Sequence, residues 1–379
     1  MTSAGSFLPG ERIANEEMEA VLGLVGGQAS RFRARVLQSN GIEGRHYALK
    51  DGRQTHLNQD LAALAIEDAL HRRGLQARDI SMLAVGTTIP DLLMPGFASM
   101  VHGRLGGAPM ETLSASGICA SSTAALKAAW LAVAAGDHDV AVAAGSELAS
   151  AMMKSSRFEH ESQVEEREGR ISSYSYFNAD FLRWMLSDGA GAFVLESKPS
   201  PRACSLRVEW IKLTSYAHQL DTCMYMGSSN PAKPAPGNTW LSNGTAGEAE
   251  QAGMLVVRQD TKLLATGMVE TVGAEAKRLF DAGQIIPEHI DHFVPHLSSY
   301  FFHETLHTTL ENAGVSIPTE KWFTNLKTKG NTGSASIFIA IEEALNQGRF
   351  KPGDRILTMV PESGRFSVSY ALYTCVGPA

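Results

Sequence analysis

Short apolar runs alternate with longer stretches of helical periodicity along the first half of the chain. The stretch after Cys119 is rich in alanine and has the composition of a buried helix, and Gly136 is placed to end it. An alternation of strand and helix patterns of this kind predicts a mostly parallel α/β sheet. The strands that we expect in this part of the chain, up to residue 213, are residues 80–85, 110–114, 140–144, 190–195 and 206–213.

The second half repeats this order of patterns without repeating the sequence. The last two apolar segments predict a hairpin across Gly364. We therefore divide the chain into an N-terminal half, residues 1–200, and a C-terminal half, residues 201–379. The elements expected in the second half are helices at 260–280, 299–313 and 334–347 and strands at 290–295, 355–360 and 367–375.

Two segments have the composition of inserted loops. Residues 158–170 are rich in glutamate, and residues 227–247 are rich in Gly, Pro, Ser and Asn. Long loops in compact domains are often functional, so both are candidate parts of a site. For the glutamate-rich segment, the alternative is a solvated stretch of surface.

Composition and charge exclude several classes of function. The chain has 379 residues, enough for two fused domains or one large α/β domain. Its formal net charge of -7 argues against nucleic acid as the main partner, because proteins that bind phosphate backbones are usually basic. Four cysteines in so long a chain predict neither a disulfide framework nor a paired metal motif, and we expect no metal and no cofactor.

No targeting or membrane segment is visible in the sequence. Residues 1–10 contain no basic stretch followed by an apolar core, so we expect no secretory signal and a cytoplasmic location. The apolar run at 124–135 contains Lys127 and is too short to span a bilayer.

Cys119 is the candidate nucleophile. It stands where a predicted strand meets a helix of small residues, in Ser116-Gly117-Ile118-Cys119-Ala120-Ser121-Ser122. A thiol at a helix start faces free N–H groups and the positive end of the helix dipole, which we expect to lower its pKa and favour the thiolate. The alternative for a single cysteine is a buried structural residue.

His296 and Asn331 are two further candidates. His296 follows the apolar strand Phe293-Val294-Pro295, and strand ends are where α/β folds expose catalytic groups. The alternative is an ordinary loop histidine. Asn331 precedes Thr332-Gly333 and a predicted helix, where an asparagine also serves as a helix cap or turn residue.

The combination of Cys119, His296 and Asn331, each at a similar junction, resembles the triad of the ketosynthase III enzymes in the thiolase superfamily. The resemblance extends over nearly the whole chain. It is carried further by Phe7-Leu8-Pro9, Asn15-Glu16-Glu17, Gly41-Ile42 with Arg45, Ser187-Asp188-Gly189-Ala190-Gly191-Ala192 and Gly330-Asn331-Thr332-Gly333-Ser334-Ala335-Ser336.

This resemblance implies a thiolase-like α/β fold of five layers, αβαβα, built from two pseudo-repeated βαβαβ halves. It also implies a homodimer, and the strand at 140–144 and the Ala-rich helix before it are similar to elements that pair across the family's dimer axis. By the same resemblance, Cys119 carries an acyl group. His296 and Asn331 then hold the carbonyl of the second thioester and stabilise its enolate.

The resemblance implies roles for the surroundings as well. The N–H groups of Cys119 and Gly364 would form an oxyanion hole for the acyl carbonyl, because hydrogen-bond donors aimed at a developing negative charge stabilise it. The candidate substrate-binding residues are Ser298, Ser299 and Arg365.

Three departures from the family pattern change the expected partners and fold. Leu297-Ser298-Ser299 stands where typical members have Gln-Ala-Asn. Arg35 and Ser39 stand where many members have the Trp and Arg that grip the nucleotide of coenzyme A. We therefore expect thioesters bound to an acyl carrier protein, with coenzyme A as the alternative carrier. Because Phe7-Leu8-Pro9 comes so early, we also expect the family's first strand to be almost absent.

A narrower resemblance is to the ketosynthases that form dialkylresorcinols and their cyclohexanedione precursors, which join two acyl chains and close a ring. In that comparison Glu147 is a candidate acid–base group, with a salt-bridged structural carboxylate as the alternative. The narrower resemblance is carried by residues 15–27, Met100-Val101-His102-Gly103, Gly145-Ser146-Glu147, residues 181–186 and Pro295-His296-Leu297-Ser298-Ser299.

The resulting hypothesis is an acyltransferase that forms carbon–carbon bonds, joining a β-ketoacyl thioester to an α,β-unsaturated acyl thioester and then cyclising the product. The first alternative is an ordinary ketosynthase III that uses malonyl carrier protein. The others are acyl transfer to an oxygen or nitrogen acceptor and an inactive subunit of a heterodimer.

Overall fold

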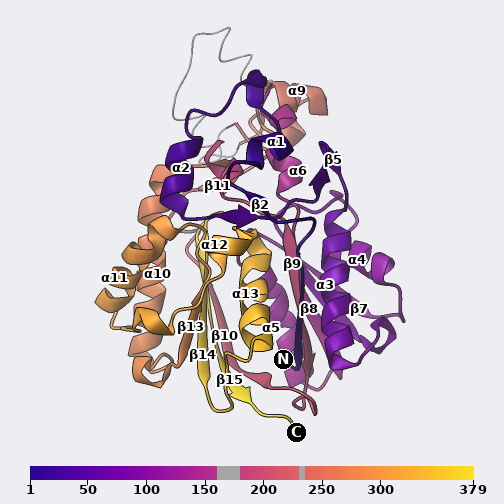
Figure 1. Cartoon of the computed structure of the whole chain (residues 1–379), viewed down its shortest axis with the longest axis vertical. Helices are drawn as coiled ribbons and strands as arrows, with labels where there is room; N and C mark the ends of the chain where they lie inside the picture. The colour runs from indigo at the N-terminus through magenta and orange to yellow at the C-terminus, as the bar shows by residue number, and fades with distance from the viewer. Residues whose placement is uncertain (160–179, 230–234) are drawn as a thin grey trace.

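The computed structural model describes residues 1–159, 180–229 and 235–379. Two sheets stand side by side with helices between them and on both outer faces, and a group of short elements covers one end (Figure 1). Most of the glutamate-rich segment 158–170 and a few residues of the segment 227–247 lie outside the described residues.

The first sheet is built from the N-terminal half in the order β1-β9-β8-β6-β7. Neighbours β8, β6 and β7 run parallel, and β9 is antiparallel to both β8 and β1. Almost every side chain of β8 and β9 is buried, as expected for strands covered on both faces. The strands are β1 (Ser3–Phe7), β6 (Met82–Thr87), β7 (Glu111–Ser116), β8 (Val140–Glu147) and β9 (Gly189–Glu196).

Two expectations about this sheet are wrong. The family's first strand is present, because Ser3–Phe7 pairs along its whole length with β9. The strand at 140–144 cannot pair across a dimer axis, because β8 lies inside the sheet between β9 and β6. The edge strands of the sheet are instead β1 and β7, and within the described residues the outer side of β7 has no strand partner.

The second sheet has the order β10-β15-β14-β13. The hairpin predicted across Gly364 is present, since β14 and β15 pair antiparallel from Arg355–Thr374 to Glu362–Ser367. Strand β13 is parallel to β14, which directs its carboxyl end toward the same edge as Glu362. The strands are β10 (Ser205–Ser215), β13 (His292–Pro295), β14 (Arg355–Glu362) and β15 (Ser367–Val376).

The helices form three layers around the two sheets, so the five-layered α/β fold predicted from the sequence is confirmed (Figure 1). Helices α3 and α4 cover the outer face of the first sheet, α5 and α13 lie between the sheets, and α10 and α11 cover the second. Their bounds are α3 (Asn58–Arg73), α4 (Phe97–Leu105), α5 (Ser121–Ala134), α10 (Thr261–Asp281), α11 (His303–Asn312) and α13 (Ser336–Asn346).

Short elements gather at one end of the molecule, beyond the carboxyl end of β8 (Figure 1). None of the helices among the described residues is both long enough and apolar enough to cross a membrane. These short elements include β2 (Ile13–Ala14), α1 (Met18–Leu22), α2 (Arg33–Asn40), β3 (Gly44–Arg45), β4 (Leu49–Lys50), β5 (Arg53–Gln54), α6 (Ser150–Met153), β11 (Met224–Tyr225), α9 (Ala246–Gln251), β12 (Arg258–Gln259) and α12 (Leu326–Lys329).

Candidate active site

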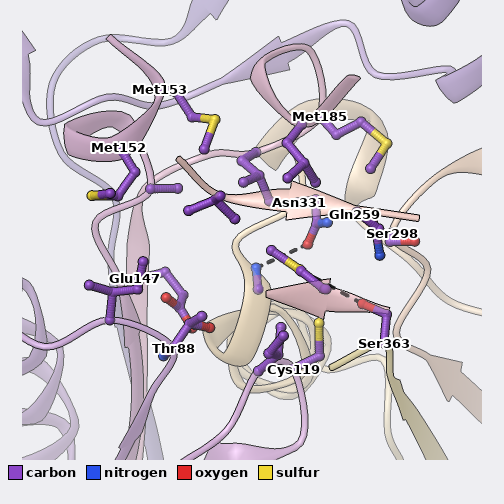
Figure 2. Close-up of a pocket in the computed structure, with 18 of the residues that line it drawn as sticks. Thr88, Cys119, Glu147, Met152, Met153, Met185, Gln259, Ser298, Asn331 and Ser363 are labelled. Carbon is purple, nitrogen blue, oxygen red and sulfur yellow. Dashed lines mark hydrogen bonds between the residues drawn. The ribbon is translucent and has the colours of Figure 1, made fainter. Parts of the chain in front are cut away.

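A pocket lies between the short elements at the end of the molecule and the carboxyl ends of the strands of the first sheet (Figure 2). Cys119, Glu147, Asn331 and Ser298 line it, although they come from distant parts of the chain. The rest of the lining is mainly apolar, with methionines prominent, which suits an acyl chain rather than a sugar or a phosphate. Its apolar residues include Met152, Met153, Leu182, Met185, Leu186 and Met224.

Cys119 lies in the predicted position, between the end of β7 and the start of α5. Its side chain is buried, with 8% of the residue exposed, and it lines the pocket. The residues before and after it, Ile118 and Ala120, each donate a backbone N–H to Oε2 of Glu362 at 3.1 Å. A carboxylate therefore occupies two donors that flank the thiol.

The expectation of a lowered thiol pKa is wrong for this structure. Burial raises the pKa of Cys119, and the negative charges of Glu362 and Glu147 raise it further. The N–H groups of Ile118 and Ala120, which flank Cys119 just before α5, are hydrogen-bonded to Glu362, and the carboxylate is thereby held close to the thiol. Cys119 is consequently a neutral thiol at rest, and its proton must leave during any acyl transfer.

Glu147 is the last residue of β8 and is 6% exposed. Its Oε1 accepts hydrogen bonds from the Thr88 N–H at 3.0 Å, the Thr88 hydroxyl at 2.6 Å and the Ser334 N–H at 3.2 Å. Burial nevertheless raises its pKa to about 7, against the opposing effect of these bonds. A buried carboxyl that titrates near neutrality is suited to accept and return a proton.

Gly333 allows this close packing around Glu147. A Cβ atom at Gly333 would lie 2.9 Å from Cγ of Glu147, and the residue has a φ of +52°. Both the space and the backbone conformation therefore favour glycine here.

Asn331 both stabilises the turn before Gly333 and lines the pocket, so both of the roles considered from the sequence apply. Its side-chain oxygen accepts the Gly333 N–H at 3.0 Å, a bond drawn in Figure 2. This bond orients the amide, because only the oxygen can accept. The amide nitrogen has no hydrogen-bond partner among the described residues and belongs to a pocket-lining side chain.

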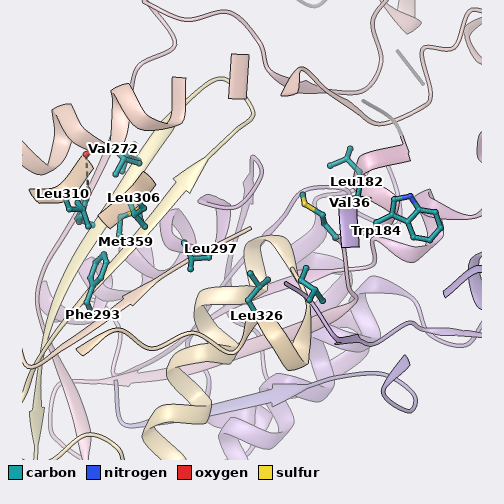
Figure 3. Packing of buried hydrophobic residues seen from close by; sticks show 14 of the residues in the cluster. Val36, Leu182, Trp184, Val272, Phe293, Leu297, Leu306, Leu310, Leu326 and Met359 are labelled. Carbon is teal, nitrogen blue, oxygen red and sulfur yellow. Dashed lines mark hydrogen bonds between the residues drawn. The ribbon is translucent and has the colours of Figure 1, made fainter. Parts of the chain in front are cut away.

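His296 follows β13 directly, as the sequence predicted, and is 4% exposed. It does not line the Cys119 pocket but an adjoining apolar cavity, and Ser298 lines both. Figure 3 shows the neighbouring core, in which Leu297, Leu306 and Met359 lie near this strand end. Burial lowers the pKa of His296 to about 4, so the imidazole is neutral, and neither ring nitrogen has a partner within the described part of the chain.

The remaining predicted residues occupy three different environments. Gly364 lies beside the nucleophile loop, since a Cβ atom there would be 3.1 Å from Ile118. Ser299 is 1% exposed, and its hydroxyl accepts the Phe301 N–H at 3.2 Å, which makes it a cap for the next helical turn rather than a pocket residue. Arg365 is exposed and does not line the pocket.

Glu362 is not among the residues predicted from the sequence, although its carboxylate is hydrogen-bonded to the nucleophile loop. A signal was available, because a glutamate directly follows the apolar run of β14 and stands two residues before Gly364. Thr88, which donates two hydrogen bonds to Glu147, is a second residue of the site that the sequence does not predict.

One group of three potential metal-ligating side chains is found within residues 1–159, 180–229 and 235–379. It comprises Glu111, Asp137 and His138. The two carboxylates are exposed, and Glu111 is at the amino end of β7, whereas Cys119 follows its carboxyl end.

Comparison with known proteins relates this geometry to a family. Residues 31–200 match the model of the beta-ketoacyl synthase N-terminal domain, and residues 280–370 match that of the 3-oxoacyl-[acyl-carrier-protein] synthase III C-terminal domain. The first matched region contains Cys119, and the second contains His296 and Asn331. These two matches together support a condensing enzyme similar to the ketosynthases III of the thiolase superfamily. Its fold is the thiolase-like fold, with two sheets and three helix layers.

The ketosynthase III-like chain is 29% identical over 354 residues to a beta-ketoacyl-[acyl-carrier-protein] synthase III of Paracoccus denitrificans, covering 93% of this chain and 92% of the relative. Among solved structures, AbyA1, a tetronic acid condensing enzyme, has a TM-score of 0.75 at 19% identity, with 98% of each chain covered. A single-residue variant of OleA from Xanthomonas campestris has a TM-score of 0.72 at 20% identity, with 98% of this chain and 97% of that chain covered.

Proposed function

We propose that this condensing enzyme joins a β-ketoacyl thioester to an α,β-unsaturated acyl thioester and closes a ring to a cyclohexanedione. In this proposal Cys119 carries one acyl chain. His296 and Asn331 hold the carbonyl of the second thioester, and the N–H groups of Cys119 and Gly364 bind the oxygen of the acyl carbonyl. The apolar pocket around Cys119 receives the acyl chains.

The observation that carries the proposal is Glu147, a buried carboxyl with a pKa of about 7 in the same pocket as Cys119 and Asn331. A decarboxylative condensation needs no such group, because the loss of carbon dioxide generates the carbon nucleophile. Addition of a β-ketoacyl carbon to an unsaturated thioester does need one, because a C–H proton must be removed.

Each step of the proposed reaction conserves atoms and protons. Glu147 accepts a proton from the carbon between the two carbonyls of the β-ketoacyl chain, and this carbon attacks the β-carbon of the unsaturated acyl group. The resulting enolate recovers a proton from Glu147. Glu147 next accepts a proton from the carbon on the other side of the ketone, and this second carbanion attacks the thioester carbonyl of the formerly unsaturated chain. The ring closes as the bond from that carbonyl carbon to sulfur breaks, and the leaving thiolate takes the proton from Glu147. Hydrogen bonds from Asn331 and His296 to the enolate oxygen stabilise each carbanion.

We propose acyl carrier protein as the carrier of the substrates. Arg35 and Ser39 both lie exposed on α2, and the hydroxyl of Ser39 donates to the Val36 carbonyl at 3.0 Å. Neither offers an aromatic surface for an adenine base. Ser298, the one proposed substrate-binding residue that lines the pocket, remains a candidate contact for the incoming thioester.

We also propose a homodimer. The support is the unpaired side of β7, whose backbone groups can extend the first sheet into a second copy. Leu93 and Met94, in the loop before α4, are 81% and 83% exposed, and the start of α4 is tied to β7 where the Ala98 N–H donates to the Ser114 hydroxyl at 2.9 Å. Apolar side chains so exposed are typical of an interface.

A second candidate function is an ordinary ketosynthase III reaction with malonyl carrier protein. The match to the Paracoccus denitrificans synthase favours it. Acyl transfer to an oxygen or nitrogen acceptor and an inactive partner subunit are the remaining alternatives. Trapping an acyl group on Cys119 by intact-protein mass would exclude the inactive subunit.

Paired thioester assays test the proposal against these alternatives. The enzyme is supplied with an unsaturated acyl thioester together with either a β-ketoacyl or a malonyl thioester, and products are identified by mass. We expect a cyclic product that has lost one or both carriers from the first pair. A strong preference for the malonyl thioester, with carbon dioxide released, would establish the ordinary ketosynthase III reaction instead.

A further inference from the structure

Glu362 is an ionisable residue near the nucleophile that none of the proposed steps uses. It ends β14, immediately before the turn that contains Gly364. Its Oε2 accepts the N–H groups of Ile118 and Ala120, both at 3.1 Å, so the carboxylate spans the backbone on the two sides of Cys119. The approach is close enough that a Cβ atom at Gly117 would lie 3.1 Å from Oε2. The nucleophile loop of one half is thereby held to the hairpin of the other.

Glu362 affects the ionisation of the Cys119 thiol. Glu362 exerts the largest effect of a charged group on Cys119, ahead of Glu147, and both raise the pKa of the thiol. Burial in turn raises the pKa of Glu362, against the two N–H bonds that favour its charged form. A free thiolate is therefore unfavourable, and proton removal must accompany the attack of sulfur on the thioester.

We propose that Glu362 accepts the proton of Cys119 during acyl loading and returns it to the departing carrier thiol. This inference rests on the proposed acylation of Cys119. As the S–H bond breaks, the proton passes to Glu362 and sulfur bonds to the acyl carbon. The bond from that carbon to the carrier sulfur then breaks, and the carrier thiolate takes the proton from Glu362. Nothing is oxidised or reduced, and Glu362 ends in its starting charge state.

Two other groups face the same region, and both are less suited to this step. The charge of Glu147 also raises the pKa of the thiol, but its Oε1 accepts hydrogen bonds from Thr88 and Ser334 on the first-sheet side of the pocket. His296 lines the adjoining cavity; neither it nor Glu362 lines the pocket that contains Cys119, so the distinction between them rests on contact with the nucleophile loop. Glu362 is the group bonded to the backbone on both sides of the nucleophile.

Glu362→Gln separates proton transfer from positioning. The amide oxygen of glutamine can still accept the two N–H groups, but the side chain no longer accepts a proton. We expect acyl loading of Cys119, followed by intact-protein mass in rapid-quench samples, to slow by about 10²–10⁴-fold, the usual contribution of a general base. We expect alkylation of Cys119 by iodoacetamide to become faster near pH 8, because removing the negative charge lowers the thiol pKa.

The decisive result is that Glu362→Gln slows acyl loading while it accelerates alkylation. If loading and alkylation both accelerate, Glu362 only suppresses the thiolate and the proposal is overturned. If both slow together, the loop has moved, and proton transfer is again not supported. Glu362→Asp provides a second test, because it keeps the carboxylate and should load faster than the glutamine variant.

Glu342→Gln is a matched control. Glu342 is a buried carboxylate on α13 that is hydrogen-bonded to Ser6 and Asn346, and it does not line the pocket. Both rates should match those of the wild type in this variant. If the wild-type enzyme itself gains no acyl mass, the proposed function fails, whereas the alkylation measurement still reports whether Glu362 acts on the thiol.

Discussion

Replacing Glu147 by glutamine is the sharpest test of the two-chain reaction. Glutamine has nearly the same shape, and its amide oxygen can accept the hydrogen bonds that Thr88 and Ser334 donate to Oε1 of Glu147. The variant loses only the ability to ionise. We therefore expect it to fold normally, to load an acyl group on Cys119 and to fail at carbon–carbon bond formation with a β-ketoacyl partner.

The size of the effect follows from the position of Glu147. Loss of a general base typically slows a reaction by about 10²–10⁴-fold. Because the pKa of Glu147 is about 7, only its ionised fraction can remove the C–H proton. This fraction is about one half at pH 7 and about one tenth at pH 6. Condensation by the wild type should therefore rise through pH 7, while the residual rate of Glu147→Gln should lack this rise.

The same substitution should change the pH dependence of stability in a defined direction. The pKa of Glu147 is raised from 4.5 to about 7 on folding, so its contribution to stability is fully present below pH 4.5 and is lost as pH rises through 7. The loss is about 3 kcal/mol at most, from the free energy equivalent of the shift. Thermal unfolding of Glu147→Gln should show less destabilisation between pH 5 and pH 8 than the wild type.

The assay uses preloaded acyl-enzyme mixed with the β-ketoacyl thioester, so that loading does not limit the rate. Product is quantified by mass over pH 5.5–8.5. An unchanged condensation rate and an unchanged pH profile in Glu147→Gln would refute the assignment of Glu147 as the base. A matching loss in acyl loading would also contradict it, since loading does not require removal of a C–H proton.

Three further predictions concern the nucleophile, the enolate site and assembly. Cys119→Ala should lose all acyl loading while substitution of any other cysteine leaves loading intact, as measured by intact-protein mass. Normal turnover by Cys119→Ala would contradict the central assignment. His296→Ala and Asn331→Ala should still load but condense about 10²–10³-fold more slowly, the usual effect of losing one preorganised donor; failure of both at loading would contradict their roles. Light scattering at micromolar concentration should show a homodimer that depends on β7, and a monomer with full activity would argue against it.

Much of the candidate site could be predicted because its residues stand at local boundaries. The strand before Cys119 and the small residues after it predict a strand–helix junction, and this junction is observed. Glu147 was predicted from the narrower family resemblance, and the structure places it at the end of β8, in the pocket that contains Cys119. His296 and Asn331 were identified from a strand end and a turn. These are short-range features, which depend on apolar periodicity and on the backbone preferences of nearby residues.

Other properties depended on contacts between the two halves and could not be read from local sequence. The thiol pKa of Cys119 is raised because folding buries it and brings Glu362 from the end of β14 to the helix start. The interior position of β8 follows from strand order, which its own apolar residues do not specify. His296 likewise ends in a neighbouring cavity because of how β13 packs. The sequence by itself determined the elements and the chemical groups at their ends; only tertiary structure decided their burial and charged neighbours, because both depend on residues far apart in the chain.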